Sequence, residues 1–282
     1  MNFQSVDEAF SKQSSVFDSL EEKNEILQWM RAEVHTHCLH HFKPGDQVLE
    51  LNCGTGIDAI FFAEHGMHVH ATDLSEAMLD ELRNKIAKKK LSDKISVQQC
   101  SFTDISVAVV AGKETMLHAE RSRRVAGQKK FNHIFSDFGG LNCVQDIEQV
   151  ISQFKNLLQP DGTVTLVIMP PVCPWEILLA IKGNFKTAFR RFKKNGADSN
   201  VEGIHFKTYY FSPSRIINAF GNDYRKLSLK GLGCFTPPPY LEKFPKQFPR
   251  LFKFLTRLDK NPAARFPFNR CADHFILTMQ LK

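Results

Sequence analysis

The stretch from Val48 to Asp73 constrains the fold of this chain more than any other part of its 282 residues. It reads VLELNCGTGIDAIFFAEHGMHVHATD, in which an apolar run meets a turn with two glycines. An apolar pattern of helical period follows, and a second short apolar run then ends in an acid. Short apolar runs joined by a helical pattern are typical of parallel strands linked by a crossover helix. The stretch therefore predicts a strand–helix–strand unit.

Three residues of this unit predict that it binds a nucleoside. Gly54 and Gly56 let the backbone approach a ligand closely, and the helix that begins beside them presents free N–H groups. Asp73 follows Gly54 by 19 positions, at the tip of the second strand. A carboxylate there can accept hydrogen bonds from two ribose hydroxyls. A dinucleotide-binding turn carries a third glycine, but position 59 is Ala59, which disfavours NAD.

The order of residues from Glu50 to Gly56, ELNCGTG, resembles the first motif of class I S-adenosylmethionine (SAM) dependent methyltransferases. That family usually has E-x-G-x-G-x-G, so Asn52 stands where a glycine is common. Asparagine tolerates a left-handed backbone better than other non-glycine residues, and we expect the turn to keep its shape. The resemblance covers residues 45–170 well and residues 200–282 loosely.

The resemblance implies which residues hold SAM. Glu50 would support the turn or meet the methionine amino group, and Asp73 would bind the ribose hydroxyls. Ser101 and Phe102 would bind the adenine, the first by a hydrogen bond and the second by stacking. The full set of implied cofactor-binding residues is Glu50, Asn52, Gly54, Gly56, Asp73, Leu74, Met78, Ser101, Phe102 and Ser136.

The implied fold is an α/β domain with a Rossmann-like sheet of seven strands, helices on both faces and an antiparallel last strand. Residues 1–45 would form a helical cap, and residues 46–282 the methyltransferase domain. Three insertions are expected in that domain: a basic loop at 106–130 and acceptor-side segments at about 171–211 and 234–270. The basic loop is longer than an ordinary connection, and we interpret it as a solvated surface loop.

The helical cap has two interpretations. In the resembling family this segment commonly forms a lid over the cofactor, with an aromatic–Asp pair and a later Arg. Phe17, Asp18 and Arg31 occupy comparable places. The alternative is a pair of helices that packs on the sheet without covering a ligand.

The loop after the fourth predicted strand narrows the acceptor class. In an open parallel sheet, ligands sit at the carboxyl ends of the strands, which places Ser136, Asp137 and Phe138 beside the transferable methyl. Family members that methylate exocyclic or amide nitrogens typically carry Pro-Pro-aromatic after the acid here. This chain has Phe138-Gly139-Gly140 instead. The loop therefore disfavours the adenine- and glutamine-modifying branches.

The second half of the chain predicts the acceptor side. Residues 174–194 and 249–258 carry apolar residues at helical spacing, with lysines and arginines on another face. Such helices usually cover a core, but they also suit a hydrophobic channel near an anionic membrane. Within the acceptor segment, His205 and Tyr209 are candidates for an acid/base pair, and Asp137 is a third catalytic candidate.

Composition limits the remaining choices. The net charge of +7 invites a nucleic-acid partner, but the basic residues cluster with Phe and Leu in a few patches. Seven cysteines without C-x-x-C pairs indicate reduced thiols in a cytoplasm and predict no metal site. We find no apolar run long enough for a membrane span and no secretion-signal pattern at the start.

These observations favour transfer of a methyl group from SAM, with S-adenosylhomocysteine as product, to a small, hydrophobic, aromatic or lipid-like acceptor. The acceptor atom, whether oxygen, nitrogen or carbon, stays open, as does the oligomeric state. An RNA or DNA methyltransferase is the first alternative, because the chain is basic. A NAD-dependent oxidoreductase and a non-catalytic SAM-binding protein are weaker alternatives. Peripheral membrane contact through the basic helices is a further hypothesis.

Overall fold

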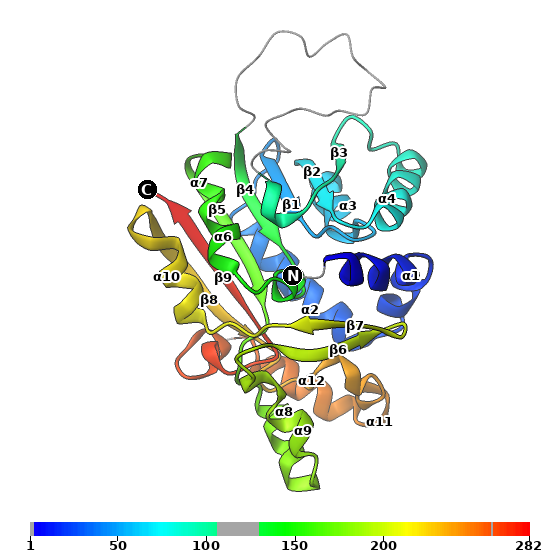
Figure 1. The fold of residues 1–282 in the computed structure, drawn as a ribbon, viewed down its shortest axis with the longest axis vertical. Helices are drawn as coiled ribbons and strands as arrows, with labels where there is room; N and C mark the ends of the chain where they lie inside the picture. The colour runs from blue at the N-terminus through cyan, green and yellow to red at the C-terminus, as the bar shows by residue number, and fades with distance from the viewer. Residues whose placement is uncertain (1–2, 106–129, 261) are drawn as a thin grey trace.

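A computed structural model describes residues 3–105, 130–260 and 262–282, and its centre is one seven-stranded sheet (Figure 1). The strand order is β3-β2-β1-β4-β5-β9-β8, and only β9 runs antiparallel to its neighbours. This is the predicted Rossmann-like sheet. The strands are β1 (Gln47–Leu51), β2 (His68–Asp73), β3 (Ile95–Gln99), β4 (Phe131–Ser136), β5 (Leu158–Ile168), β8 (Tyr224–Leu232) and β9 (His274–Leu281).

Helices cover both faces of the sheet. One hydrophobic core lies between the sheet and α2, α3 and α4, and the other lies between the sheet and α6, α7 and α10. The helices are α1 (Phe3–Glu22), α2 (Glu25–Leu39), α3 (Ile57–Glu64), α4 (Glu76–Lys89), α6 (Ile147–Ser152), α7 (Phe154–Leu157), α8 (Pro174–Leu178), α9 (Phe185–Ala188), α10 (Pro213–Phe220), α11 (Phe244–Gln247) and α12 (Pro249–Leu258).

Alternation along the strands explains why both faces need cover. In β1, Val48 belongs to the α2–α4 core, whereas Leu49 and Leu51 belong to the other core. Successive side chains of a strand point to opposite faces, so a run of apolar residues must be covered twice. The strand order reverses between β1 and β4, and the crevice at their carboxyl ends is where such sheets bind ligands.

The prediction of one continuous helix across residues 174–194 is wrong. The segment breaks into α8, a 3₁₀ turn at Leu179–Lys182, α9 and another turn at Arg190–Phe192. Gly183 adopts a φ of +76° and ends the first part, and Asn184 caps the next. The apolar stripe finds no core beneath it, since Ile181 is 82% exposed, and an apolar stripe stabilises a long helix only when it is buried.

A two-stranded hairpin, β6 (Ala197–Val201) and β7 (Ile204–Thr208), follows that segment. The alternation of residues from His205 to Phe211 predicts a strand at β7 but none at β6. The turn between the strands has positive φ at Glu202 (+50°) and Gly203 (+81°), the conformation of a tight type I′ hairpin turn. Figure 1 shows the hairpin beside α1, and their rings meet where Phe10 lies 6.0 Å from Phe206 between centroids.

Two sequence expectations concern other parts of the chain. The basic loop expected at 106–130 lies, but for its last residue, outside the described residues. No helix of the described residues is both long and apolar enough to cross a lipid bilayer.

Candidate functional site

The turn after β1 has the left-handed backbone that the glycine pattern predicts. Asn52, Gly54 and Gly56 have φ of +48°, +53° and +78°. A Cβ on Gly56 would lie 2.2 Å from the Leu82 side chain, so only glycine fits there. Asn52 adopts the predicted conformation, and its side chain also forms hydrogen bonds that a glycine could not form. Its amide donates to the carbonyl of Asp137 at 2.8 Å and accepts from the Ser136 hydroxyl at 2.5 Å.

Asp73 lies directly against this turn. One carboxylate oxygen accepts from the Gly54 backbone N–H at 2.8 Å and the other from the Ser75 N–H at 2.9 Å. Burial raises the pKa of Asp73 above its usual value, although these N–H groups oppose the rise. Each oxygen keeps a second lone pair for a ligand, as ribose binding requires.

A buried group of charges lies behind the turn. Arg31, from α2, forms ion pairs with Glu21, Asp58 and Asp137. Burial alone would raise the pKa of Asp58, but Arg31 and His35 outweigh it and hold that pKa below its usual value. Burial and the nearby charge of Asp58 raise the pKa of Asp137 well above its usual value.

Glu50 adds a further acid to this group. It is 1% exposed, and its Oε2 atom has no hydrogen-bond partner among the described residues. Burial and the Asp58 charge raise its pKa well above the usual value. Carboxylates therefore outnumber cations here, and such an arrangement attracts a cationic ligand.

Phe138 shows backbone strain at the same place. Its φ is +36°, a region that bulky residues rarely adopt and that recurs at functional sites. The ring is held from two sides: the Arg31 guanidinium lies 4.7 Å from its centroid, and His274 meets it edge-on at 5.7 Å. We infer that the surrounding packing fixes the loop after β4 in this shape.

A cavity opens between the turn, the loop after β4 and α1. Its charged lining consists of three carboxylates and one guanidinium, and the rest is largely apolar. The lining residues are Phe3, Val6, Phe10, Phe17, Arg31, Asn52, Cys53, Gly54, Thr55, Ile57, Asp58, Asp73, Leu74, Met78, Phe102, Asp137, Phe138, Gly139, Gly140 and Cys143.

Most of the predicted cofactor residues line this cavity, and four do not. Glu50 is buried behind the turn, and Gly56 ends the turn against the Leu82 side chain. The Ser136 hydroxyl is engaged by Asn52, and the Ser101 hydroxyl is engaged by Thr103 at 3.0 Å. Phe102, by contrast, does line the cavity.

Helix α1 supplies several side chains of the lining, and the sequence predicted only some of them. Phe17 and Arg31 were expected in a lid, and both line the cavity together with three further α1 side chains. The Thr55 hydroxyl of the turn donates to Asp18 of α1 at 2.5 Å. This geometry favours the lid interpretation over a helix packed away from the ligand.

Asp58 of α3 also lines the cavity, and the sequence did not predict it as a site residue. An acid in the first turn of a helix usually indicates only compensation of the helix dipole.

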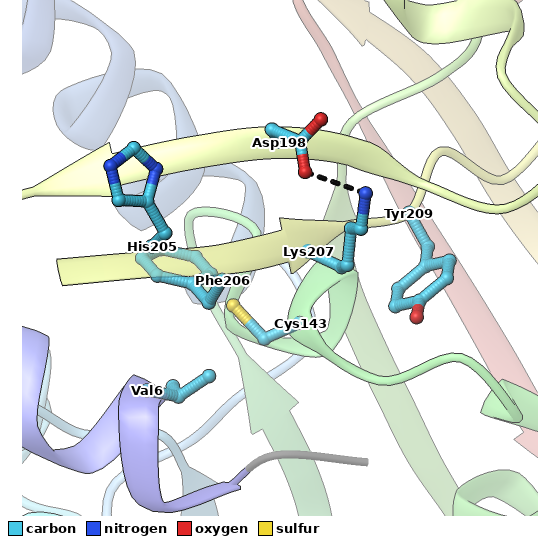
Figure 2. A pocket seen from close by; sticks show the side chains of 7 residues that line it. All are labelled: Val6, Cys143, Asp198, His205, Phe206, Lys207 and Tyr209. Atoms are coloured by element: carbon cyan, nitrogen blue, oxygen red, sulfur yellow. Dashed lines mark hydrogen bonds and ion pairs between the residues drawn. The ribbon is translucent and has the colours of Figure 1, made fainter.

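A second pocket adjoins the first and shares Val6 and Cys143 with it (Figure 2). The hairpin and the residues after it form its other wall. Asp198 and Lys207 form an ion pair of 2.6 Å at its rim. The remaining lining residues are His205, Phe206 and Tyr209.

The two acid/base candidates, His205 and Tyr209, are not bonded to each other. His205 is exposed and its Nε2 lies 2.9 Å from the Asn200 amide, while the Tyr209 hydroxyl donates to Gln145 at 3.4 Å. Figure 2 shows the two rings at opposite ends of the pocket, with Phe206 and Lys207 between them. The structure therefore does not bring His205 and Tyr209 together as a hydrogen-bonded pair.

Comparison with known proteins agrees with this geometry. Residues 48–162 match the family model described as methyltransferase domain. In sequence, this region of the chain is therefore similar to a methyltransferase domain. Its fold extends further than that match: the CcbJ methyltransferase from Streptomyces caelestis superimposes with a TM-score of 0.59 over 97% of this chain and 98% of its own, at 16% identity.

Two curated relatives are similar to part of this chain. A demethylmenaquinone methyltransferase from Symbiobacterium thermophilum is 32% identical over 106 residues, which cover 36% of this chain and 42% of that protein. A SAM-dependent Diels-Alderase, iccD, from Talaromyces variabilis is 24% identical over 124 residues, 44% of this chain and 36% of that protein. The chain spans less than half the length of the curated relatives it matches.

Proposed function

We propose that this protein transfers a methyl group from SAM to a small, hydrophobic, aromatic or lipid-like acceptor that binds in the second pocket. The charge of the first cavity carries the cofactor assignment. SAM bears a sulfonium and an ammonium, and three carboxylates against one guanidinium suit a cation. NAD carries a diphosphate, which the same carboxylates would repel. The match to a methyltransferase domain supports the same choice.

When bound, SAM supplies an electrophilic methyl that an acceptor displaces in line, so the chain's main task is alignment. Asp73 and the glycine turn would hold the nucleoside, and Phe102 would face the adenine. The turn residues and Asp58 would meet the methionine end. Of the three catalytic candidates, Asp137 lies in the cavity lining, and its raised pKa suits a base that takes a proton from the acceptor.

The acceptor class rests on the second pocket and its surroundings. The pocket joins the cofactor cavity through Val6 and Cys143, and Phe206 supplies an aromatic wall. One relative, similar over part of its length, is a demethylmenaquinone methyltransferase, which supports a small quinone-like acceptor. A nucleic-acid acceptor is less favoured, because the pocket rim has a neutralised ion pair in place of a basic track.

The protein's compartment belongs with this proposal. All seven cysteines are free, which supports a reducing compartment such as the cytoplasm. A lipid-like acceptor would in addition require contact with a membrane surface.

The test is thermal stabilisation by SAM, by S-adenosylhomocysteine and by NAD, followed by transfer of labelled methyl to candidate acceptors. We expect SAM and its product to raise the melting temperature and NAD to leave it unchanged. Asp73→Ala should remove the shift because it loses the ribose contact, whereas Asp80→Ala on the exposed side of α4 should keep it. Stabilisation by NAD alone would refute the cofactor assignment.

Binding without methyl transfer would separate the remaining alternatives. One relative is a SAM-dependent Diels-Alderase, so SAM binding without methyl transfer is an outcome to test. If SAM binds but no acceptor in a panel of quinones, phenols and lipids gains labelled methyl, the transfer proposal fails while the cofactor assignment stands.

A further inference from the structure

Residues 177–194 present apolar side chains to solvent instead of to the core. Five large side chains are between 50% and 82% exposed, although side chains of this type usually lie inside. We call this segment, with the residues of α12 described below, the basic-aromatic surface. Its first five apolar members are Leu178, Ile181, Phe185, Phe189 and Phe192.

Unpaired positive charge accompanies these apolar side chains. From Ile177 to Ala197 the chain contains no acid. Two arginines of the stretch, Arg190 and Arg191, turn inward and pair with the buried Glu176. The four lysines are exposed and form no ion pair among the described residues; they are Lys182, Lys186, Lys193 and Lys194.

Helix α12 repeats the same chemistry next to this segment. Trp175 of α8 meets Phe244 of α11 edge-on at 5.8 Å, which places the two helical segments side by side. From Lys243 to Leu258 the chain again has no acid. Three of its large apolar side chains are about half exposed, and three cations lie among them. These residues are Phe248, Leu251 and Phe254 with Lys246, Arg250 and Lys253.

The basic-aromatic surface lies on the acceptor side of the molecule. It follows β5, which ends at Ile168, and so begins at the end of the sheet where the carboxyl ends of the parallel strands and the cofactor cavity lie. Figure 1 shows α8 and α9 projecting beyond that end of the sheet, with α11 and α12 beside their base. A ligand that leaves a membrane bound to this surface would therefore reach the protein on the side of the proposed acceptor pocket.

We propose that the basic-aromatic surface docks on an anionic lipid bilayer, with the apolar side chains inserted among the headgroups and the lysines paired with lipid phosphates. Membrane docking extends the proposed function, because a bilayer is where a lipid-like acceptor resides, but it does not depend on methyl transfer. Two other partners fit less well. A second copy would bring like charges together in a two-fold interface. An RNA strand could stack its bases on the Phe rings, but it would leave the aliphatic side chains of Leu178, Ile181 and Leu251 without an apolar partner.

The test is sedimentation of the full chain with vesicles of phosphatidylcholine, with or without phosphatidylglycerol, at low and high salt. We expect binding only to the anionic vesicles and a loss of binding at high salt. Lys182→Glu with Lys186→Glu should weaken binding at least about tenfold, since each basic residue near the surface contributes on the order of 1 kcal/mol. Ile181→Ser with Phe185→Ser should weaken it too, because apolar insertion is lost. SAM binding should stay unchanged in both double variants.

Matched controls keep the result interpretable. Lys88→Glu with Lys90→Glu makes the same change of charge at the C-terminal end of α4, and Leu227→Ser removes an apolar side chain that is 40% exposed on β8. Both controls should bind vesicles as the natural chain does. Equal binding by the surface variants and the natural chain would overturn the proposal. So would self-association, or binding to RNA but not to vesicles, that the same variants abolish. Because the readout is lipid binding, failure here leaves methyl transfer untouched.

Discussion

At the scale of single residues, Asp137 has the strongest link between charge and function. It lines the cofactor cavity, lies 3.4 Å from Arg31, and has a pKa raised well above its usual value by burial and by Asp58. A raised pKa means that this carboxyl keeps its proton to a higher pH than an ordinary aspartate does. A cationic ligand placed beside it favours the charged form and lowers its pKa.

We therefore expect SAM binding to release protons and SAM affinity to rise with pH until Asp137 is fully ionised. Titration calorimetry in buffers of different ionisation enthalpy measures the proton release directly. Asp137→Asn should abolish most of the release, whereas Asp80→Asn on α4 should leave it unchanged. Proton uptake on binding, or a release that survives Asp137→Asn and is equal to that of the natural chain, would contradict the assignment.

Asn52 shows what the sequence could and could not give at this scale. A left-handed turn was predictable from the residue type alone, and its φ of +48° confirms it. Its hydrogen bonds to Ser136 and Asp137, at the end of β4, were not predictable, because these residues are more than 80 positions away. The backbone conformation of a residue depends mainly on its own type and its neighbours in sequence, whereas its long-range hydrogen-bond partners depend on the assembled sheet.

At the scale of elements, α1 connects the two pockets. Val6 lines both, and Phe10 reaches the hairpin residue Phe206. The helix is fastened to the glycine turn by the bond between Asp18 and Thr55, and to α4 by the ion pair between Asp18 and Lys85. Because Asp18 does not line the cavity, it acts on the cofactor only through the position of α1.

Asp18→Ala should loosen the lid without removing a direct ligand contact. A charge-assisted hydrogen bond is worth about 1.5–3 kcal/mol, so we expect SAM to dissociate at least about tenfold faster. Hydrogen exchange at the α1 amides should rise in parallel. Glu8→Ala, which removes an exposed ion pair with Lys12 on the same helix, is the control and should change neither rate. Faster dissociation without faster exchange in α1 would exclude the lid mechanism.

The elements also separate what periodicity can predict from what it cannot. The apolar pattern from His274 to Leu281 predicts the last strand with the bounds that β9 has, since its residues alternate between two cores that the rest of the sheet supplies. The broken segment at 174–194 has an equally regular apolar pattern but no core beneath it. Apolar spacing states which residues share a face, and it does not state whether anything covers that face.

At the scale of the whole molecule, His37 joins the cap to the far edge of the sheet. It lies on α2, and its Nε2 is 2.8 Å from the Thr278 hydroxyl of β9 and 3.3 Å from the Ser228 hydroxyl of β8. Burial, with smaller contributions from His41, Lys230 and His40, lowers the pKa of His37 to about 4. The native state therefore holds this imidazole neutral at a pH where an unfolded histidine is charged.

The sign of the pH dependence follows from proton binding. Between about pH 6.5 and pH 4 the unfolded chain binds a proton at His37 that the native chain does not, so the free energy of unfolding falls as pH falls. The stability is fully present above about pH 6.5, and up to about 3 kcal/mol is lost by pH 4. Urea unfolding measured across that range should show the loss. His37→Gln keeps a donor for Thr278 but cannot titrate, so its stability should vary less with pH, while His68→Gln at an exposed position of β2 should follow the natural chain. If His37→Gln keeps the full pH dependence, protonation of His37 between α2 and the β8–β9 pair does not control acid stability. His133, whose pKa burial also lowers, then becomes the site to test.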